Sequence, residues 1–508
     1  MGYTVHFENA KNGELTCKIN DKYLHSKYSP TNEAKTFVNN IDCSFNPAVI
    51  FVVGAGLPYC FSYLKARFPL AIVATIQCTK DFLKYDTSWD TVFYLNDNEK
   101  NLSEKIFSTF GEDKLFSTLC ISWNPSLQIF AEKTQRALKA VLKSIAQSKD
   151  LLITRTFFNK RWTLNTLRFF TFLHSVATIK TGTQSVFIAA SGPSLKDSMP
   201  FIKRNRKKIF LVAVSSSCNY FIENNIFPDV AISTDGGYYA KKHLECLIDK
   251  NIPIMLSAES AFPAKLLEQN KVIPLCYNDG LEAELFSMCG IPHVGASRNG
   301  TVSGTAVSLF LKLSNGPILL GGLDLCTNKN FVHVNPNKLE LLDSLSDNRF
   351  LPLSTRTVTN SFNSTALEIY RSWFEGLPSN SKNRLFRIFS EPSNQISLAG
   401  IKDITVNQAD LLVSKNFTPF LLTNKKILNH NIMNKKLLSY FVNLKKDFEQ
   451  KKNIEKNRFF IESVSLVDLL LAEKYPNNND YLLLAITKTE HFINQLINKL
   501  NRIMDTNK

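Results

Sequence analysis

The sequence of 508 residues predicts an α/β protein with two parallel-sheet domains followed by a C-terminal helical bundle. Through most of the chain, short apolar runs that end in Gly or Ser alternate with stretches in which apolar residues recur at the spacing of an α-helix. The last part is instead rich in Lys, Asn and Leu at helical spacing. With 44% hydrophobic residues the chain can form packed cores. These changes in sequence pattern predict three domains, at residues 1–155, 156–405 and 406–508.

The first domain opens with a strand–turn–helix–strand pattern. Ala48–Val53 is an apolar run that ends at Gly54-Ala55-Gly56, and Pro58–Arg67 has helical spacing before a second apolar run, Leu70–Ile76. Such a βαβ unit is normally right-handed and places its strands parallel. The sequence therefore predicts a Rossmann-like N-terminal domain.

The glycine turn of this domain is either a dinucleotide cradle or a structural turn. A dinucleotide fingerprint requires a third glycine three residues after the second and an acidic residue about twenty residues further on. Tyr59 occupies the third position, and the second strand ends at Gln77. Both departures favour the structural turn.

The second domain is predicted to be a parallel α/β sheet, because its strands are short, apolar and terminated by small or polar residues. In open α/β sheets, ligands bind beyond the carboxyl ends of the strands. The polar residues that follow these runs are therefore the candidate binding residues. The runs are Ser185–Ala190, Ile209–Val214, Val230–Ser233, Ile254–Ser257, Val272–Leu275 and Pro317–Leu320.

The turn Ser191-Gly192-Pro193-Ser194-Leu195 follows the first of these runs. Gly192 allows close approach of a ligand to the backbone, and Pro193 fixes the entry to a helix. Ser194 can cap that helix, whose N–H groups favour an anion. A Ser-capped turn without a ligand accounts for the same residues, and both interpretations remain open at this point.

Four further groups follow strand ends: Ser215-Ser216-Ser217, Asp235-Gly236-Gly237, Asn299–Thr305 and Gly321–Asp324. Asn299–Thr305 opens an apolar helix and is a second predicted anion site. Asp324 would bind a hydroxyl or a base amine, or would simply cap the following turn. The candidate ligand-binding residues at these strand ends are Gly192, Pro193, Ser194, Ser215, Asp235, Thr301, Ser303, Gly304 and Gly322.

His333 is the best candidate for a general base, because it follows the glycine-rich strand end by nine residues in the same domain. With Asp324 it makes up the predicted catalytic pair. The sequence has no Asp-x-Asp pair, no His/Cys/carboxylate cluster at metal spacing and no Walker motif. The residue types therefore favour a transfer reaction without a bound metal or cofactor.

The net charge of +16 and a pI near 9.2 favour anionic partners. The basic run Lys203–Lys208 is either a nucleic-acid patch or, as we favour, a solvated helix end. The ten cysteines lack Cys-x-x-Cys pairs, and no apolar run approaches the ~18–20 residues of a membrane span. We therefore expect a cytoplasmic protein without membrane insertion or nucleic-acid binding.

Several segments together resemble the motility associated factor (Maf) flagellin glycosyltransferases. Leu24–Pro30 resembles their N-terminal signature, and Phe158–Asn165 resembles the segment that leads into their central domain. The middle series follows the order and spacing of that family. It comprises Gly192–Leu195, Ile226–Val230 before Thr234-Asp235, Gly300–Thr305, Gly322–Leu325 and His333.

The resemblance implies a central domain similar to bacterial sialyltransferases and to 6-hydroxymethylpterin diphosphokinases. It implies a CMP-activated nonulosonic acid, of pseudaminic or legionaminic type, as donor and flagellin Ser or Thr as acceptor. Gly192, Ser194, Ser215, Asp235 and Ser303 would then line CMP, and His333 would be the base. Two rival functions are an ATP-dependent pterin diphosphokinase and a non-catalytic flagellin-binding chaperone.

Overall fold

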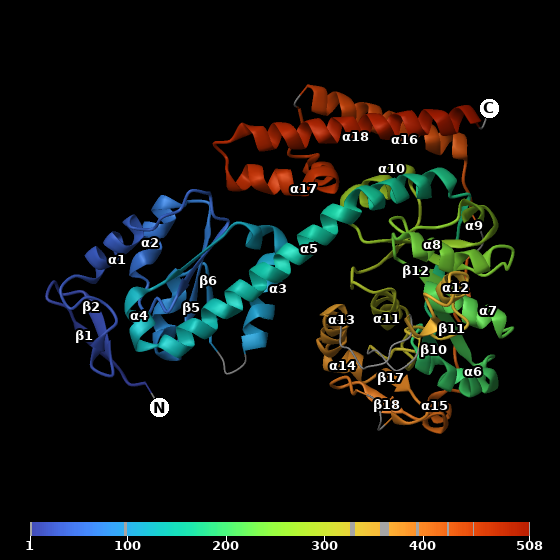
Figure 1. Cartoon of the computed structure of the whole chain (residues 1–508), viewed down its shortest axis with the longest axis horizontal. Helices are drawn as coiled ribbons and strands as arrows, with labels where there is room; N and C mark the ends of the chain where they lie inside the picture. Colours follow the sequence, from blue (N-terminus) through green and yellow to red (C-terminus); the bar gives the residue numbers. More distant parts are fainter. Residues whose placement is uncertain are drawn as a thin grey trace. The chain divides into compact units, whose positions relative to one another are not determined.

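We describe a computed structural model of the chain that covers residues 3–95, 99–325, 331–355, 365–392, 396–423, 426–450 and 452–506 (Figure 1). The chain divides into two compact units. Unit 1 comprises residues 1–159 and 455–492, and unit 2 comprises residues 160–454 and 493–508. The first boundary lies close to the one expected at residue 155, whereas the residues of the expected third domain are shared between the two units.

Unit 1 is built on a four-stranded parallel sheet in the order β6-β5-β4-β7. Every residue of β4 is buried, as expected for the central strand of a sheet covered on both faces. A small antiparallel sheet, β1-β2-β3, precedes it. The strands are β1 (Val5–Asn9), β2 (Leu15–Ile19), β3 (Lys22–Tyr23), β4 (Val49–Val53), β5 (Ile72–Gln77), β6 (Thr91–Tyr94) and β7 (Thr118–Ser122).

Alternate residues of β4 feed two separate cores, because successive side chains of a strand point to opposite faces. Ile50 and Val52 pack with α1 and α2, while Phe51 packs with α3 and the first part of α5. Figure 1 shows these helices on the two sides of the sheet. The helices are α1 (Pro30–Asn39), α2 (Tyr59–Arg67), α3 (Glu99–Phe116), α4 (Asn124–Ile129) and α5 (Ala131–Phe172).

Unit 2 contains an 11-stranded sheet in the order β18-β17-β16-β10-β11-β12-β13-β14-β8-β20, with β15 beside β14. The strands from β18 to β14 run parallel, as the sequence predicts for β10 to β14 and β16; β17 and β18 were not predicted. The main strands are β10 (Ser185–Ala189), β11 (Ile209–Val214), β12 (Val230–Ser233), β13 (Ile254–Ser257), β14 (Val272–Cys276), β16 (Ile318–Gly321), β17 (Leu385–Ile388) and β18 (Lys402–Ile404). The short strands of this sheet are β8 (Ser175–Val176), β15 (Val294–Gly295) and β20 (Lys426–Ile427). Strands β9 (Ile179–Lys180) and β19 (Leu421–Leu422) form a separate two-stranded sheet.

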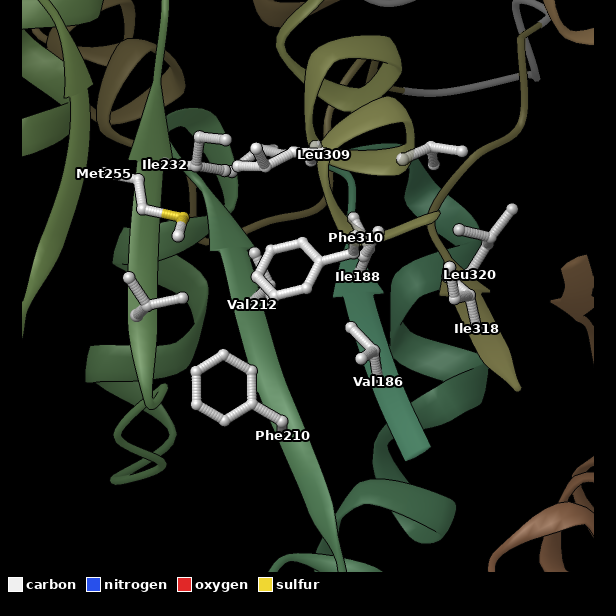
Figure 2. Close-up of a cluster of buried hydrophobic side chains, with 14 of the residues drawn as sticks. Val186, Ile188, Phe210, Val212, Ile232, Met255, Leu309, Phe310, Ile318 and Leu320 are labelled. Carbon is white, nitrogen blue, oxygen red and sulfur yellow. The ribbon is translucent and has the colours of Figure 1, made fainter. Parts of the chain in front are cut away.

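Helix α11 (Val302–Leu313) supplies much of the core of unit 2. Its Leu309 and Phe310 lie over side chains from β10, β11, β12 and β16 (Figure 2). Both side chains are at most 2% exposed, and burying each stabilises the fold by roughly 1.5–3 kcal/mol. The other helices up to the tail are α6 (Met199–Asn205), α7 (Cys218–Glu223), α8 (Tyr238–Leu244), α9 (Ala264–Gln269), α10 (Gly280–Cys289), α12 (Lys338–Ser344), α13 (Thr365–Glu375), α14 (Ser379–Lys382) and α15 (Val406–Leu412).

The C-terminal region is helical, as predicted: α16 (His430–Glu449), α17 (Arg458–Lys474) and α18 (Asn479–Thr506). Pro476 lies between the last two, where its lack of an N–H ends regular helix. One helix is longer than expected. The sequence pattern predicts Ser126–Ala146, but α5 extends to Phe172, since no Gly or Pro interrupts residues 131–172.

Candidate functional site at the carboxyl edge of the central sheet

The chain reverses direction across the central sheet between β10 and β16. From β10 it proceeds outward through β11, β12, β13 and β14, and it then returns to β16 on the other side of β10. The crevice outside the carboxyl ends at such a reversal is where open α/β sheets bind ligands. The turns after β10 and β16 are therefore the first candidates for a site.

Ser194 and Asp324 join these two turns. The Ser194 hydroxyl donates to Oδ1 of Asp324, and the Ser194 backbone N–H donates to Oδ2 at 3.1 Å. Ser194 is 7% and Asp324 5% exposed. Burial raises the pKa of Asp324, while the hydrogen bonds from Ser194 and the charge of Arg387 oppose that rise. The expectation that Ser194 caps the following helix is wrong, because its hydroxyl is committed to Asp324.

Gly192 and Gly322 let the same two turns approach closely. The N–H of Gly192 donates to the carbonyl of Gly322 at 2.8 Å. A Cβ at Gly192 would lie 2.6 Å from Asp324 Oδ2, and one at Gly322 would lie 2.7 Å from the Ala190 carbonyl oxygen. Pro193 begins the short 3-10 helix Pro193–Ser198. The close approach at these glycines is between two parts of the chain itself.

His333 lies across the same strand ends. The N–H of the next residue, Val334, donates to the carbonyl of Ser191 at 2.8 Å, and Asn337 Nδ2 donates to the carbonyl of Ser216 at 3.0 Å. Segment 333–337 thus bridges the turns after β10 and β11. Burial lowers the pKa of His333. The charged form of His333 adds to burial in lowering the pKa of His243, on α8, to about 4.

The predicted Asn299–Thr305 site forms the start of α11. Thr301 is the N-cap residue, and its hydroxyl accepts the N–H of Gly304 at 2.8 Å. The hydroxyl of Ser303 and the N–H groups of Val302 and Ser303 have no partner within the described ranges. Because α11 leads into β16 of a parallel sheet, its N-terminus lies at the carboxyl edge of the strands. This helix start offers free donors at that edge.

Helix α13, which the sequence analysis did not single out, connects the start of α11 with the turn after β16. The Tyr370 ring lies 3.4 Å from the position of a Cβ on Gly300, and Arg371 Nη2 donates to the Leu325 carbonyl at 2.9 Å. Burial raises the pKa of Tyr370, and the negative charge of Asp235 adds to this rise. Asp235 and the start of α11 are therefore both close to Tyr370.

Ser215 and Asp235 follow β11 and β12 as predicted, but they differ in access. Ser215 is 3% exposed and opens the 3-10 turn Ser215–Ser217. Asp235 is exposed, and its Oδ1 accepts the N–H of Gly237 at 2.7 Å. Within the described residues, no hydrogen bond joins Ser303 directly to Ser194 or His333. Ser303 is thus related to Ser194 and His333 through the sheet edge that they share and through α13.

A second polar cluster at this edge was missed by sequence reasoning. Arg298 bridges Glu259, after β13, and Asp279, after β14, at distances from 2.6 to 3.3 Å. Its guanidinium also lies 4.1 Å from the centroid of the Tyr277 ring. Arg298 directly precedes Asn299, so this fork anchors the loop that leads into α11. The sequence feature that could have revealed this cluster is the presence of an acidic residue, Glu259 or Asp279, shortly after each of two apolar runs.

Glu282 lies beneath this cluster and is 1% exposed. It accepts the N–H of Tyr277, whereas its Oε2 has no partner among the described residues. Burial raises the pKa of Glu282 to about 8, and the charge of Glu259 contributes to this rise. The carboxyl group is thus largely protonated at neutral pH.

The glycine turn of unit 1 is occupied by the protein itself. A Cβ at Gly56 would lie 2.5 Å from Leu24, and one at Gly54 would lie 2.7 Å from Ser126. Gln77, at the end of β5, binds both the N–H and the carbonyl of Gly56 and also donates to Asp86 at 2.7 Å. These contacts agree with the structural turn favoured from the sequence.

The basic run lies at the opposite edge of the central sheet. α6 ends at Asn205, and Arg206 forms a two-pronged ion pair with Asp229 at 2.9 and 3.0 Å. Across the described ranges, no group of three or more His, Cys, Asp and Glu side chains is placed to hold a metal ion. None of the described helices is long and apolar enough to cross a bilayer. Every described cysteine is a free thiol, and Cys326 lies outside those residues.

The fold and the site define a two-unit α/β protein with polar side chains at the carboxyl edge of its central sheet. Residues 161–330 match the family model described as 6-hydroxymethylpterin diphosphokinase MptE-like. The chain also has the fold of the MAf glycosyltransferase from Magnetospirillum magneticum AMB-1, with a TM-score of 0.59 and 12% identity over 99% of this chain and 92% of that one. These matches confirm the resemblance to the Maf proteins.

A sequence relative is found in Treponema pallidum (strain Nichols), in a protein described as uncharacterized. It is 28% identical over 408 residues, which span 79% of this chain and 90% of the relative. The similarity therefore extends well beyond the segment matched by the family model.

Proposed function

We propose that the protein is a glycosyltransferase that moves a nonulosonic acid, of pseudaminic or legionaminic type, from a CMP-activated donor to Ser or Thr of flagellin, as flagellum assembly and motility require. The observation that carries the proposal is the position of His333 across the carboxyl ends of β10 and β11. Free donors at the start of α11 lie at the same edge. The fold shared with a MAf glycosyltransferase supports it.

In this proposal the acceptor hydroxyl attacks the anomeric carbon of the sugar. A new bond forms between the acceptor oxygen and that carbon, while the bond from the carbon to the phosphate oxygen breaks and CMP leaves with its electron pair. His333 takes the hydroxyl proton. Its lowered pKa keeps the imidazole neutral at pH 7, the form that accepts a proton. A positioned base contributes typically ~10²–10⁴-fold to the rate.

The departing phosphate is stabilised by the start of α11. The N–H groups of Val302 and Ser303 and the Ser303 hydroxyl supply donors, and the helix dipole favours negative charge there. Asp324 acts as a positioning residue, because both of its oxygens accept hydrogen bonds from Ser194. Gly192, Ser194, Ser215, Asp235, Thr301, Gly304 and Gly322 shape the surroundings of the nucleotide.

The direct test is the mass of flagellin incubated with the protein and a CMP-activated nonulosonic acid. The proposal predicts added sugar masses on Ser or Thr and none when the donor is omitted. Flagellin that stays unmodified with each CMP-nonulosonic acid, although the protein binds it, would favour the chaperone. We further propose that the reaction takes place in the cytoplasm.

An ATP-dependent pterin diphosphokinase is the second candidate, favoured by the description of the family matched by residues 161–330. Titration calorimetry with CMP, ATP and UDP separates the two activities. Preference for CMP supports the glycosyltransferase, and preference for ATP supports the kinase.

A further inference from the structure

Unit 1 contains a groove along the edge strand of its four-stranded sheet. Strand β7 ends the four-stranded sheet and, among the described strands, pairs with β4 alone. A cavity of about 880 Å³ is lined by consecutive residues of β7 and its continuation, Leu119–Pro125. Consecutive residues point to opposite faces of a sheet, so a cavity that touches all of them lies against the edge of the strand.

Helix α1 forms the opposite wall of this groove, which we call the β7 groove. Its Asn32, Thr36 and Phe37 line the cavity, together with Asn40 just after its end. A channel between an edge strand and a helix is the geometry in which extended peptides bind by adding a strand. The cavity is in the range of ligand pockets, and its elongated wall fits a chain segment.

The pairing of β7 with β4 determines which backbone groups face the groove. The carbonyl of Ser117 accepts from β4, and the N–H of Trp123 donates to Val53. Since orientation alternates along a strand, the odd-numbered residues face β4, and Thr118, Cys120 and Ser122 direct their N–H and C=O groups outward. No partner of these outward groups is found within the described ranges.

Strand β7 also lacks the usual protection of an exposed edge. Edge strands normally carry charged residues, proline or bulges that prevent pairing with another chain. The sequence Thr118–Ser122, TLCIS, has neither a charge nor a proline, and all five residues are partly exposed. An unprotected edge beside a groove is suited to receive a strand.

The charge of the β7 groove indicates what it binds. Its lining includes Glu33 and Asp42 but neither Lys nor Arg, in a chain with a net charge of +16. A phosphate or another anion would find no cationic partner there. An uncharged or basic polypeptide segment meets no such penalty, and its backbone supplies the hydrogen bonds that β7 lacks.

We propose that an uncharged or basic, extended segment of the acceptor polypeptide binds in the β7 groove as an added strand on the outer edge of β7. Flagellin as the partner rests on the proposed function. The interaction would hold the acceptor through its backbone, so the bound segment need not contain the modified Ser or Thr.

The test uses the full-length protein and flagellin from the same organism. Thr36→Trp places a large side chain in the β7 groove, at an exposed position whose side chain makes no hydrogen bond among the described residues. Asn39→Trp is the matched control, because Asn39 is also exposed and uncharged on α1 but does not line the cavity. Thr36→Trp should weaken flagellin binding at least tenfold, and Asn39→Trp by less than twofold.

A second variant addresses the backbone directly. Cys120→Pro removes an outward N–H, while the inward groups of the neighbouring residues still pair with β4. It should weaken flagellin binding similarly. In hydrogen exchange, flagellin should protect the amides of Cys120 and Ser122 in the wild-type protein.

Wild-type affinity of Thr36→Trp for flagellin would overturn the proposal. So would a wild-type dimer that Thr36→Trp converts to a monomer, because a second copy would then occupy the groove. CMP affinity, measured in parallel, should stay unchanged in all three variants. If the protein binds flagellin through β7 but does not bind CMP, the proposed glycosyltransferase activity is contradicted and the proposed docking site is not.

Discussion

Ser194 presents both its hydroxyl and its backbone N–H to the carboxylate of Asp324, which ties the turn after β10 to the turn after β16. The two residues are separated by 130 positions in the chain and are both largely buried. This pair fixes the geometry of the turns at the point where the sheet changes direction. The proposed site therefore depends on it even if neither residue touches substrate.

Ser194→Ala should destabilise unit 2 by roughly 1–3 kcal/mol, because it leaves a buried carboxylate oxygen of Asp324 without its donor. Urea unfolding measures this change. Ser346→Ala is the control, since Ser346 is exposed and, among the described residues, only its backbone is hydrogen-bonded. Equal stability of Ser194→Ala and the wild type would show that the pair contributes nothing to the fold.

The sequence predicted six strands of the central sheet closely, β10 to β14 and β16, because each is an apolar run ended by small or polar residues, whereas β17 and β18 were not predicted. β10, β11 and β16 begin and end within one residue of the expected positions. It could not predict that Ser194 binds Asp324, since that bond depends on which strands become neighbours. Arg298, Tyr370 and His243 were missed for the same reason: their importance comes from tertiary contacts.

His333→Ala should lower the transfer rate by ~10²–10⁴-fold with little change in CMP affinity, because a general base acts in the chemical step. Burial lowers the pKa of His333 below its ordinary value of 6.5. The base is neutral above its pKa, so the acid limb of the rate profile should lie below pH 6.5. Transfer by His333→Ala at the wild-type rate would remove the residue from the mechanism.

Arg298→Lys should weaken CMP binding about three- to tenfold. An ammonium group cannot pair with both Glu259 and Asp279 as the guanidinium does, so the loop before α11 would be held less firmly. Calorimetry with CMP measures the effect. Arg206→Lys is the matched control, as it breaks a comparable fork with Asp229 at the opposite sheet edge. If both variants bind CMP equally well, the loop does not contribute to nucleotide binding.

Glu282 should make the stability of unit 2 dependent on pH. Its pKa is about 8 in the folded protein against 4.5 for an ordinary Glu, so the folded state binds the proton more tightly. Stability then falls as pH rises between these values, by roughly 1.4 kcal/mol per pH unit relative to Glu282→Gln. Urea unfolding at pH 5, 6.5 and 8 measures the difference. Exposed Glu268→Gln should follow the wild type; a Glu282→Gln profile parallel to wild type would contradict the shift.

Gly56→Ala tests whether the glycine turn of unit 1 has room for a side chain, and Gly13→Ala, outside that turn, is its control. Both glycines have positive φ, but a Cβ at Gly56 would lie 2.5 Å from Leu24, whereas one at Gly13 meets nothing within 4 Å. Gly13→Ala should therefore cost about 1 kcal/mol, and Gly56→Ala roughly 1–3 kcal/mol more. Urea unfolding compares them, and equal losses would mean that the turn has room for a side chain.

Hydrogen exchange of the full-length protein with and without CMP tests whether the nucleotide binds at the carboxyl edge of the central sheet. We expect saturating CMP to slow exchange of the amides after β10 and β11 and at Val302 and Ser303, with no change along β7. Protection confined to other segments, or none at saturation, would contradict a nucleotide site at the carboxyl edge of the central sheet.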